Sequence, residues 1–394
     1  MTRLRLLILF LIAFLVGVDE FLLGPVLTPI GHDLAVPPER ITVFIAAYSL
    51  PLALLAPVAG ALSDLVGRMT VLVPASAIFG LASIATALAP SFEAGLAWRV
   101  LTGVGSAGML PVAFALAGDE PGERSARAIA VVQAGLTLGI ILSPGLGALA
   151  AEFASWRLAF AGLGGLALAA ALAAVLATGA APAAGAAGRA AVGGGLLVPG
   201  AVGSLVAMAL GLGGAVGIFA LVGERLRDLF GLGTTTVGVV YAVFGAATLA
   251  GNLAMPWLVR RIGGGRRVMR LALFCVLAAI LLVFALPGAS LALVSLGLLV
   301  WAVMGGAGAP ALQSHLADLS PARRGTLMAL GASALNLGVA VSSALAGVFY
   351  TTSPLWVAGL GTALLAIAIL GLRPVRSGAD EAAGGCRAEL CEHR

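Results

Sequence analysis

Lysine is absent from this chain of 394 residues, and all 22 of its basic residues are arginine. A Walker-type nucleotide loop needs a lysine on the phosphates, and a Schiff-base cofactor needs a lysine amine. The chain alone is therefore neither a P-loop ATPase nor a pyridoxal or retinal protein. Histidine is also scarce, with three widely spaced residues. We therefore expect no clustered enzyme site, no metal site and no cofactor.

Charged residues make up only 10% of the chain and hydrophobic residues 61%, with a mean hydropathy of +1.11. A soluble domain cannot hide that much apolar surface, because its exterior must be wettable. Lipid is the solvent that fits such a chain. A bilayer-spanning helix needs roughly 20 apolar residues, so the length allows about a dozen spans. The net charge of +5 is then an orientation signal rather than a nucleic-acid footprint.

Cysteine is rare as well, and its three positions predict no disulfide framework. Cys275 falls inside an apolar segment. Cys386, Cys391 and His393 in the tail could bind a soft metal, although an unstructured tail is the favoured interpretation. The first apolar run is too long for a cleavable signal peptide and is followed by many others.

Charges and turn residues divide the chain into twelve apolar segments. This division predicts an all-α membrane protein with two six-helix bundles. The expected spans are 6–31, 42–63, 69–90, 95–117, 128–151, 156–178, 197–222, 234–258, 268–287, 290–313, 326–350 and 354–372. A small-residue linker without apolar periodicity, 179–196, separates the bundles 1–178 and 197–373, and a tail follows at 374–394.

Arginine counts on alternate loops predict the orientation in the membrane. Seventeen arginines fall on one side, against four on the other, namely Arg40, Arg157, Arg225 and Arg227. The positive-inside rule then places both termini and the linker in the cytoplasm of a multi-pass plasma (inner) membrane protein.

The two halves repeat at an offset of 199 residues, which indicates duplication. The matching pairs are Pro57 with Pro256, Arg68 with Arg267, Pro111 with Pro310, Asp119 with Asp318, Arg124 with Arg323, Gly139 with Gly338, and Ser143 with Ser342. Two parallel six-span repeats around a central cavity are a known transporter architecture.

The turn after the second span reads "GALSDLVGRM", with Gly60, Asp64, Gly67 and Arg68. It resembles the signature loop of the major facilitator superfamily, and the resemblance implies the major facilitator fold, whose two six-helix bundles surround a central cavity. We expect Gly60 to allow close helix approach, Gly67 a tight turn, Asp64 a helix cap or a pair with arginine, and Arg68 an anchor at the lipid surface. The resemblance implies a cytoplasmic gate, the loop latching that side shut in the outward-open state. The second-half counterpart has Arg260 where the acid would be.

The fifth span contains "GLTLGIILSPGLGALA", in which Gly139, Pro144, Gly145 and Gly147 resemble the antiporter motif of the same superfamily. Ser143 replaces a glycine of that motif. The resemblance implies exchange of substrate for protons. Generic packing of small residues is the competing interpretation.

The fourth span opens with "LAWRVLTGVGSAG", which resembles the arginine-containing motif of the superfamily. Arg99 is a charge at membrane depth and should find a partner, because an unpaired one costs at least ~2.5 kcal/mol. We expect it to pair with Asp19 or Glu20, the other charges at that depth. The alternative is that Arg99 extends to the outer interface.

Asp19 and Glu20 interrupt the first apolar segment, in "FLVGVDEFLLGP". They lie about 100° apart on a helix, so they cannot face a cavity equally. An acid held between burial, which favours its neutral form, and a nearby arginine, which favours its charged form, can take up and release a proton. We predict proton coupling through Glu20, slightly favoured, Asp19 and Arg99. Either acid alone could instead be structural.

Several other residues are predicted to line the substrate cavity. They are Phe21, Gly24, Tyr48, Gln133, Gln313 and Asn336. The favoured function is proton-coupled export of small amphiphilic compounds or drugs by a monomer whose partners are substrate, protons and lipid. The alternatives are an efflux carrier for a defined metabolite such as a sugar or amino acid, and uniport or lipid flipping. We expect neither an enzyme nor a nucleic-acid binder.

Overall fold

The computed structural model describes residues 2–121, 123–178, 200–320 and 324–372, and all regular structure in these ranges is helical. The expected linker 179–196 and the tail 374–394, with Cys386, Cys391 and His393, lie outside them. Within the described ranges, eleven helices are long and apolar enough to cross a membrane. The bent pair formed by α1 and α2 makes a twelfth if it crosses as one span.

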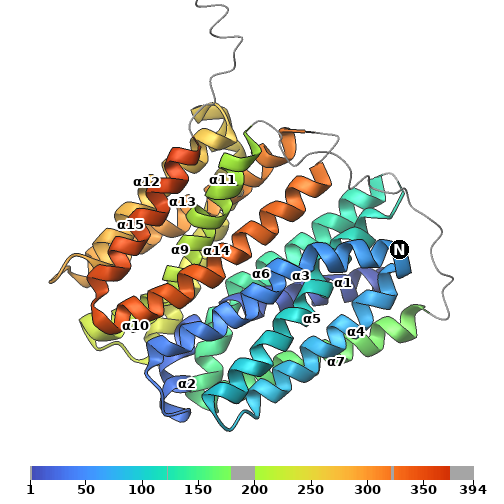
Figure 1. Ribbon diagram of the computed structural model, residues 1–394, viewed down its shortest axis with the longest axis horizontal. Coiled ribbons are helices and arrows are strands. Elements are labelled where there is room, and N and C mark those ends of the chain that lie inside the picture. Colours follow the sequence, from blue (N-terminus) through green and yellow to red (C-terminus); the bar gives the residue numbers. More distant parts are fainter. Residues whose placement is uncertain (1, 122, 179–199, 321–323, 373–394) are drawn as a thin grey trace, which may run out of the picture.

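The N-terminal half runs in order from α1 to α7 and occupies one side of the molecule (Figure 1). Its elements are α1 (Arg3–Phe21), η1 (Gly24–Val26), α2 (Leu27–Asp33), η2 (Pro38–Ile41), α3 (Thr42–Val66), α4 (Arg68–Ala87), α5 (Phe92–Gly118), α6 (Glu123–Phe153) and α7 (Trp156–Thr178).

The C-terminal half occupies the other side (Figure 1). Its elements are α8 (Ala201–Val206), the π-helix η3 (Ala207–Gly213), α9 (Gly214–Phe219), α10 (Val222–Phe230), α11 (Thr234–Ile262), α12 (Gly265–Phe284), α13 (Leu291–Asp318), α14 (Arg324–Thr352) and α15 (Pro354–Gly371). Helix α3 packs along α14, and α6 along α11. We call the end of the bundle where α1 begins the terminal end, and the end that holds α2 and α10 the distal end.

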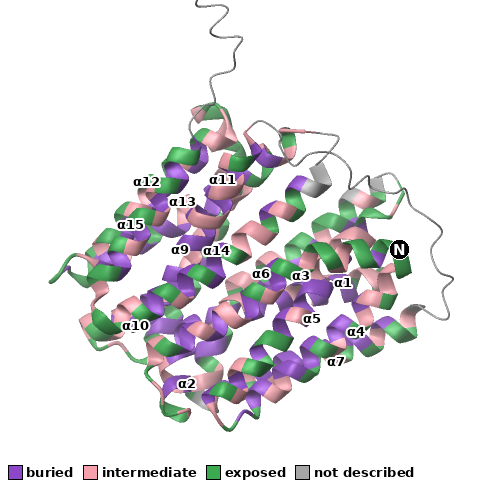
Figure 2. Ribbon diagram, viewed as in Figure 1, coloured by how far each residue is buried: buried purple, intermediate pink, exposed green. Residues whose placement is uncertain are grey.

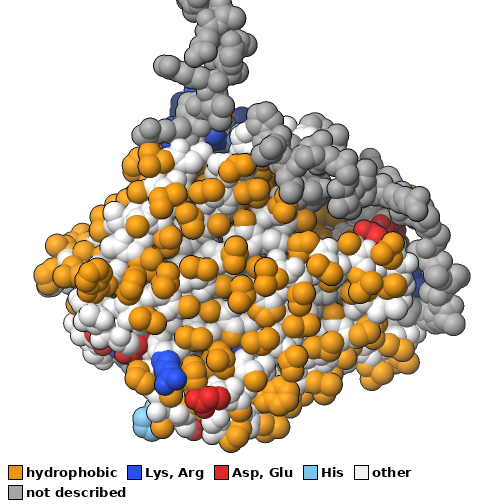
Figure 3. Space-filling model, viewed as in Figure 1, with side chains coloured by type: hydrophobic (Ala, Val, Ile, Leu, Met, Phe, Trp, Pro, Cys, Tyr) orange, Lys and Arg blue, Asp and Glu red, His pale blue; other side chains and the backbone are white. Residues whose placement is uncertain are grey.

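Apolar side chains cover the outside as well as the inside of this bundle. In Figure 2 buried residues face neighbouring helices, while exposed residues cover the outer helix surfaces. Figure 3 shows that most side chains on the outer face are hydrophobic and that the charged ones gather toward its ends. Such a surface suits a hydrocarbon solvent.

The first expected span is broken rather than continuous over 6–31. The pair Arg3–Phe21 and Gly24–Asp33 is bent by 42°. Pro25 cannot supply a backbone N–H to continue the helix. Gly24 is needed at the break because a Cβ there would lie 2.8 Å from the Tyr241 ring of the other half. The segment at the bend, η1, is thus in close contact with α11.

Matching contacts in both halves agree with the internal repeat. Ser143 on α6 donates a hydrogen bond to the carbonyl of Val18 on α1. Ser342 on α14 donates to the carbonyl of Gly213 at 3.0 Å. The two serines are 199 residues apart, but their acceptors are 195 apart (213 minus 18). The difference is about one helical turn, and η3 with its π-helical winding lies in the shifted stretch.

Candidate functional site

An ion pair lies in the interior of the N-terminal half. Arg99 Nη1 on α5 donates to both carboxylate oxygens of Asp19 on α1, at 2.7 and 2.9 Å. The exposed fraction of the Arg99 side chain is 1% and that of Asp19 is 0%. Arg99 is therefore held inside the bundle and does not extend to the outer interface.

Two aromatic rings pack against the buried guanidinium. Its carbon lies 4.7 Å from the centre of the Tyr48 ring and 5.4 Å from that of Phe160. Ser106 fixes Tyr48 through a hydrogen bond of 2.8 Å. Tyr48, predicted to line the substrate cavity, packs on the ion pair, is buried and does not line the pocket between the halves. The ring–cation contact adds to the stability of the buried charge.

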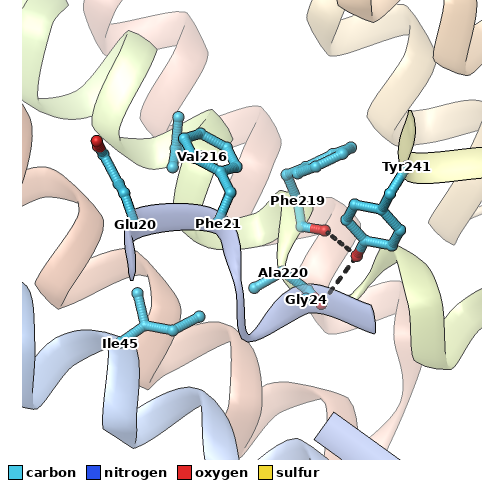
Figure 4. Close-up of a pocket in the computed structure, with 8 residues that line it drawn as sticks. All are labelled: Glu20, Phe21, Gly24, Ile45, Val216, Phe219, Ala220 and Tyr241. Atoms are coloured by element: carbon cyan, nitrogen blue, oxygen red, sulfur yellow. Dashed lines mark hydrogen bonds between the residues drawn. The ribbon is translucent and has the colours of Figure 1, made fainter. Parts of the chain in front are cut away.

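Glu20 is in a different environment, although it follows Asp19 directly. It lines a small pocket between the halves, together with Phe21, Gly24, Ile45, Val216, Phe219, Ala220 and Tyr241. In Figure 4 Glu20 and Phe21 extend from the same turn of α1, and Tyr241 lies across the pocket beside Gly24. Among the described residues, Glu20 takes part in no hydrogen bond or ion pair.

Aromatic side chains from three helices of the C-terminal half, α9, α11 and α13, gather at this pocket. The Phe219 ring centre lies 4.1 Å from Phe244, 4.9 Å from Tyr241 and 5.5 Å from Trp301. Phe21 reaches the same cluster from the N-terminal half, at 6.5 Å from Phe219. Sequence reasoning found Phe21 but missed the others, because their spacing along the chain carries no signal that they meet.

The remaining predicted cavity residues do not line this pocket. Gln133 is exposed and donates to Thr137 at 3.3 Å. Asn336 donates to the carbonyl of Ala332 on its own helix at 3.1 Å. Gln313 is exposed near the terminal end of α13. The prediction that these three form a site with Phe21 and Gly24 is therefore not met at the pocket.

The signature loop between α3 and α4 lies at the terminal end. Gly67 has φ +98°, a conformation that favours glycine and makes the turn. Arg68 is in an ion pair with Asp64 and bonds Asp119 at 2.9 Å, so it joins the loop to the end of α5 instead of serving only as a lipid anchor. The expected role of Gly60 in close packing is wrong, because nothing lies within 4 Å of its Cβ position.

Two of the antiporter-like glycines of α6 pack on α1. A Cβ at Gly139 would lie 2.2 Å from the Phe14 carbonyl oxygen, and one at Gly147 would lie 3.0 Å from that of Leu22. Pro144 lies inside α6 between them. Gly145 faces the other half, with Ala242 at 3.8 Å. Gly139 and Gly147 thus set how closely the acid-bearing helix approaches α6.

Asp19 and Glu20 have no acidic counterparts at the matching positions of the other half. With the acceptor offset of 195 residues, Asp19 corresponds to Gly214 and Glu20 to Ala215. A Cβ at Gly214 would lie 3.2 Å from the Leu364 side chain, so no carboxyl group could occupy that place without rearrangement. The site is therefore asymmetric within a symmetric scaffold.

Comparison with known proteins agrees with this architecture. An uncharacterised MFS-type transporter of Bacillus subtilis, YbcL, is 26% identical over 378 residues, covering 93% of this chain and 95% of that protein. The multidrug resistance protein MdtD of Escherichia coli strain 536, itself described as putative, matches locally, with 32% identity over 160 residues that cover 40% of this chain and 34% of that protein.

A solved structure shares the fold over nearly the whole chain. It is a bacterial homologue of the human lysosomal transporter Spinster in an inward-facing and occupied conformation, with a TM-score of 0.69, 18% identity and coverage of 93% of this chain and 91% of that one. The sequence profile of the Major Facilitator Superfamily matches residues 9–307 and 205–389. The chain belongs to the Major Facilitator Superfamily and is a multi-pass membrane transporter.

Proposed function

We propose that this transporter exports small amphiphilic compounds or drugs in exchange for protons, by alternating access. The observation that carries the proposal is the separation of the two acids. Asp19 is bound to a buried arginine, whereas Glu20 faces a pocket between the halves and has no counter-charge among the described residues. A carboxyl group in that position can exchange a proton for a cationic or polar group of the substrate.

Asp19 and Arg99 are proposed to position this acid rather than to bind the proton. Their ion pair fixes α1 against α5 one residue away from Glu20. Breaking a buried pair by removing one partner leaves an uncompensated charge. The pair is therefore suited to remain intact while Glu20 changes its protonation state.

The pocket supports an amphiphilic substrate. Phe21, Phe219 and Tyr241 supply apolar surface, and Glu20 supplies one polar group. Binding sites for small molecules commonly combine predominantly apolar walls with few polar groups. The local similarity to the multidrug resistance protein supports the same class of substrate.

The arginine distribution supports one orientation of the cycle in the membrane. We propose that the distal end faces outward, that both termini are cytoplasmic in an inner membrane, and that Gly60, Asp64, Gly67 and Arg68 belong to the cytoplasmic gate. The transporter acts as a monomer in this proposal. Protons then enter from the distal side, and substrate enters from the cytoplasm.

Transport driven by a proton gradient tests this function. Purified protein is first screened by thermal shift against lipophilic cations, sugars and amino acids, and ligands that stabilise it are taken into proteoliposomes. We expect a lipophilic cation to bind and an imposed proton gradient to drive its counterflow. Stabilisation by sugars alone would favour a metabolite carrier, and binding without gradient-driven flux would contradict antiport.

A further inference from the structure

A polar cluster joins the two halves at the distal end and has no part in the function proposed above. Glu224 on α10 is 7% exposed and accepts hydrogen bonds from the Thr28 hydroxyl at 2.7 and 2.9 Å. Arg227 donates to Glu224 at 2.8 Å and to the Pro25 carbonyl at 2.8 Å. Thr28 and Pro25 belong to the N-terminal half, so this group of four residues, the distal lock, holds the halves together.

The distal lock adjoins the pocket of Glu20 along both halves of the chain. Glu20, Gly24 and Thr28 are four residues apart along α1, η1 and α2. On the other half, the Tyr241 hydroxyl accepts from the Gly223 N–H and donates to the Phe219 carbonyl, each at 3.1 Å. These bonds tie the start of α10 to the pocket wall. The helix that carries Glu224 and Arg227 is therefore bonded both to the pocket wall and to the N-terminal half.

Acids outnumber the arginine that pairs with Glu224 in its immediate surroundings. Burial is the largest influence and raises the pKa of its carboxyl group, and Arg227 and the Thr28 hydrogen bonds oppose that rise. Two further acids, Asp228 and Glu39, raise it again. The titratable groups that face Glu224 are Arg227 and Asp228 of α10, Glu39 of η2, Tyr241 of α11 and Tyr350 of α14.

Among the described residues, Arg227 is the one arginine in an ion pair with Glu224. Arg225 donates to the Val283 carbonyl at 3.0 Å, and Arg227 divides its guanidinium between Glu224 and a carbonyl. When the halves separate, water reaches Glu224 and the influence of burial is removed. The closed lock then binds a proton more tightly than the open one.

We propose that Glu224 is a second proton-binding site of the transport cycle, which takes up a proton from the distal solution as the lock closes. The neutral carboxyl group keeps an oxygen that accepts hydrogen bonds from Thr28 and Arg227. By linkage, lowering the pH favours the closed lock across the interval between the ordinary pKa of a glutamate and the raised one. One proton changes the ratio of closed to open lock at most ~tenfold per pH unit. The inference rests on the proposed function for alternating access, but not on Glu20.

Distance measurement between two spin labels tests this inference without any substrate. The labels are placed on cysteines introduced at exposed positions, His32 of α2 and Thr235 of α11, after the natural cysteines are replaced by serine. All measurements are made in a Glu20→Gln background, which removes the pocket acid. The result for the lock therefore does not depend on whether Glu20 couples transport to protons. The fraction of molecules with the short distance is measured in nanodiscs from about pH 8 to about pH 4, a range that spans the titration of glutamates.

We expect the short-distance fraction to rise as the pH falls. Glu224→Gln should remove the pH dependence and keep the lock closed throughout. Asp228→Asn, which removes the neighbouring exposed acid, should keep the pH-dependent rise. A Glu224→Gln protein that follows the unsubstituted background, or whose lock is open at every pH, would overturn the proposal.

Thr28→Val provides a second test if the glutamine variant does not fold. This substitution removes the Thr28 hydroxyl, and with it the hydrogen bonds that lower the Glu224 pKa. Because Thr28 also holds the lock closed, the lock should open more at high pH, and the ratio of closed to open lock should change more between high and low pH than in the unsubstituted background. A change in this ratio that is the same or smaller would count against Glu224 as the proton-binding group.

Discussion

Asp19 and Glu20 are adjacent on α1, yet Asp19 is bound to Arg99 at 2.7 Å while Glu20 lines the pocket between the halves. The helical rotation of about 100° between neighbours is the physical reason. One residue points into the N-terminal bundle, and the next points toward the other half. Two carboxyl groups of similar chemistry thereby receive different tasks in the proposed cycle.

Asp19→Asn should destabilise the protein. The amide leaves Arg99 buried without a negative partner, which costs about 3–5 kcal/mol when a buried pair is broken. Chemical unfolding of the purified protein in detergent measures the change in the free energy of unfolding. Glu20→Gln is the matched control and should change it far less, since no ion pair is lost. Equal stability of the Asp19→Asn variant and wild type would refute the positioning role.

Glu20→Gln should separate proton coupling from substrate movement. The amide cannot release a proton, so flux driven by a proton gradient should fall at least about tenfold. Exchange of labelled for unlabelled substrate across proteoliposomes needs no net proton movement and should persist. Gradient-driven flux that survives at the wild-type rate would rule out Glu20 as the coupling acid.

Two glycines that both belong to family-like motifs should respond oppositely to a methyl group. Gly139→Ala places Cβ 2.2 Å from the Phe14 carbonyl oxygen and should cost about 1–3 kcal/mol, because the α1–α6 contact must open. Gly60→Ala meets nothing within 4 Å and should be neutral or stabilising by about 0.5–1 kcal/mol, through helix propensity. Thermal unfolding of both variants in one detergent compares them. A larger loss at Gly60 would contradict the packing described.

Tyr241→Phe should weaken the wall of the pocket. It removes the hydroxyl that accepts from the Gly223 N–H and donates to the Phe219 carbonyl. Leaving these buried backbone groups without partners costs about 1–3 kcal/mol. Hydrogen exchange at α10 should become faster. Tyr350→Phe, which removes a hydroxyl bonded to the exposed Asp228, serves as control and should leave exchange at Gly223 unchanged.

The sequence predicted the helices well because lipid imposes a simple rule on length and hydropathy. The expected span 156–178 coincides with α7 (Trp156–Thr178), and 354–372 differs from α15 (Pro354–Gly371) by one residue. The break near Gly24 was not predicted, although glycine followed by proline is a usual breaker. At this break Gly24 packs against the Tyr241 ring of the other half, a contact that one helix cannot reveal.

The site was only partly predictable for the same reason. Charges at membrane depth identified Asp19, Glu20 and Arg99, because each is costly there and must be explained. Tyr241 and Phe219 carry no such signal, since aromatic residues are ordinary in apolar helices. Glu224 lies in a strongly amphipathic segment after a span, and that pattern indicates a surface helix without showing which residue it buries.

Infrared difference spectroscopy of the carboxyl groups tests the central claim, that Glu20 rather than Asp19 exchanges the proton. Spectra of wild type, Glu20→Gln and Asp19→Asn are recorded in lipid between about pH 5 and about pH 9, which brackets the proton exchange expected of a coupling acid. A Glu224→Gln background removes the signal of the distal lock. We predict that the band of the titrating carboxyl persists in Asp19→Asn and disappears in Glu20→Gln. A band lost in Asp19→Asn and kept in Glu20→Gln would contradict the account.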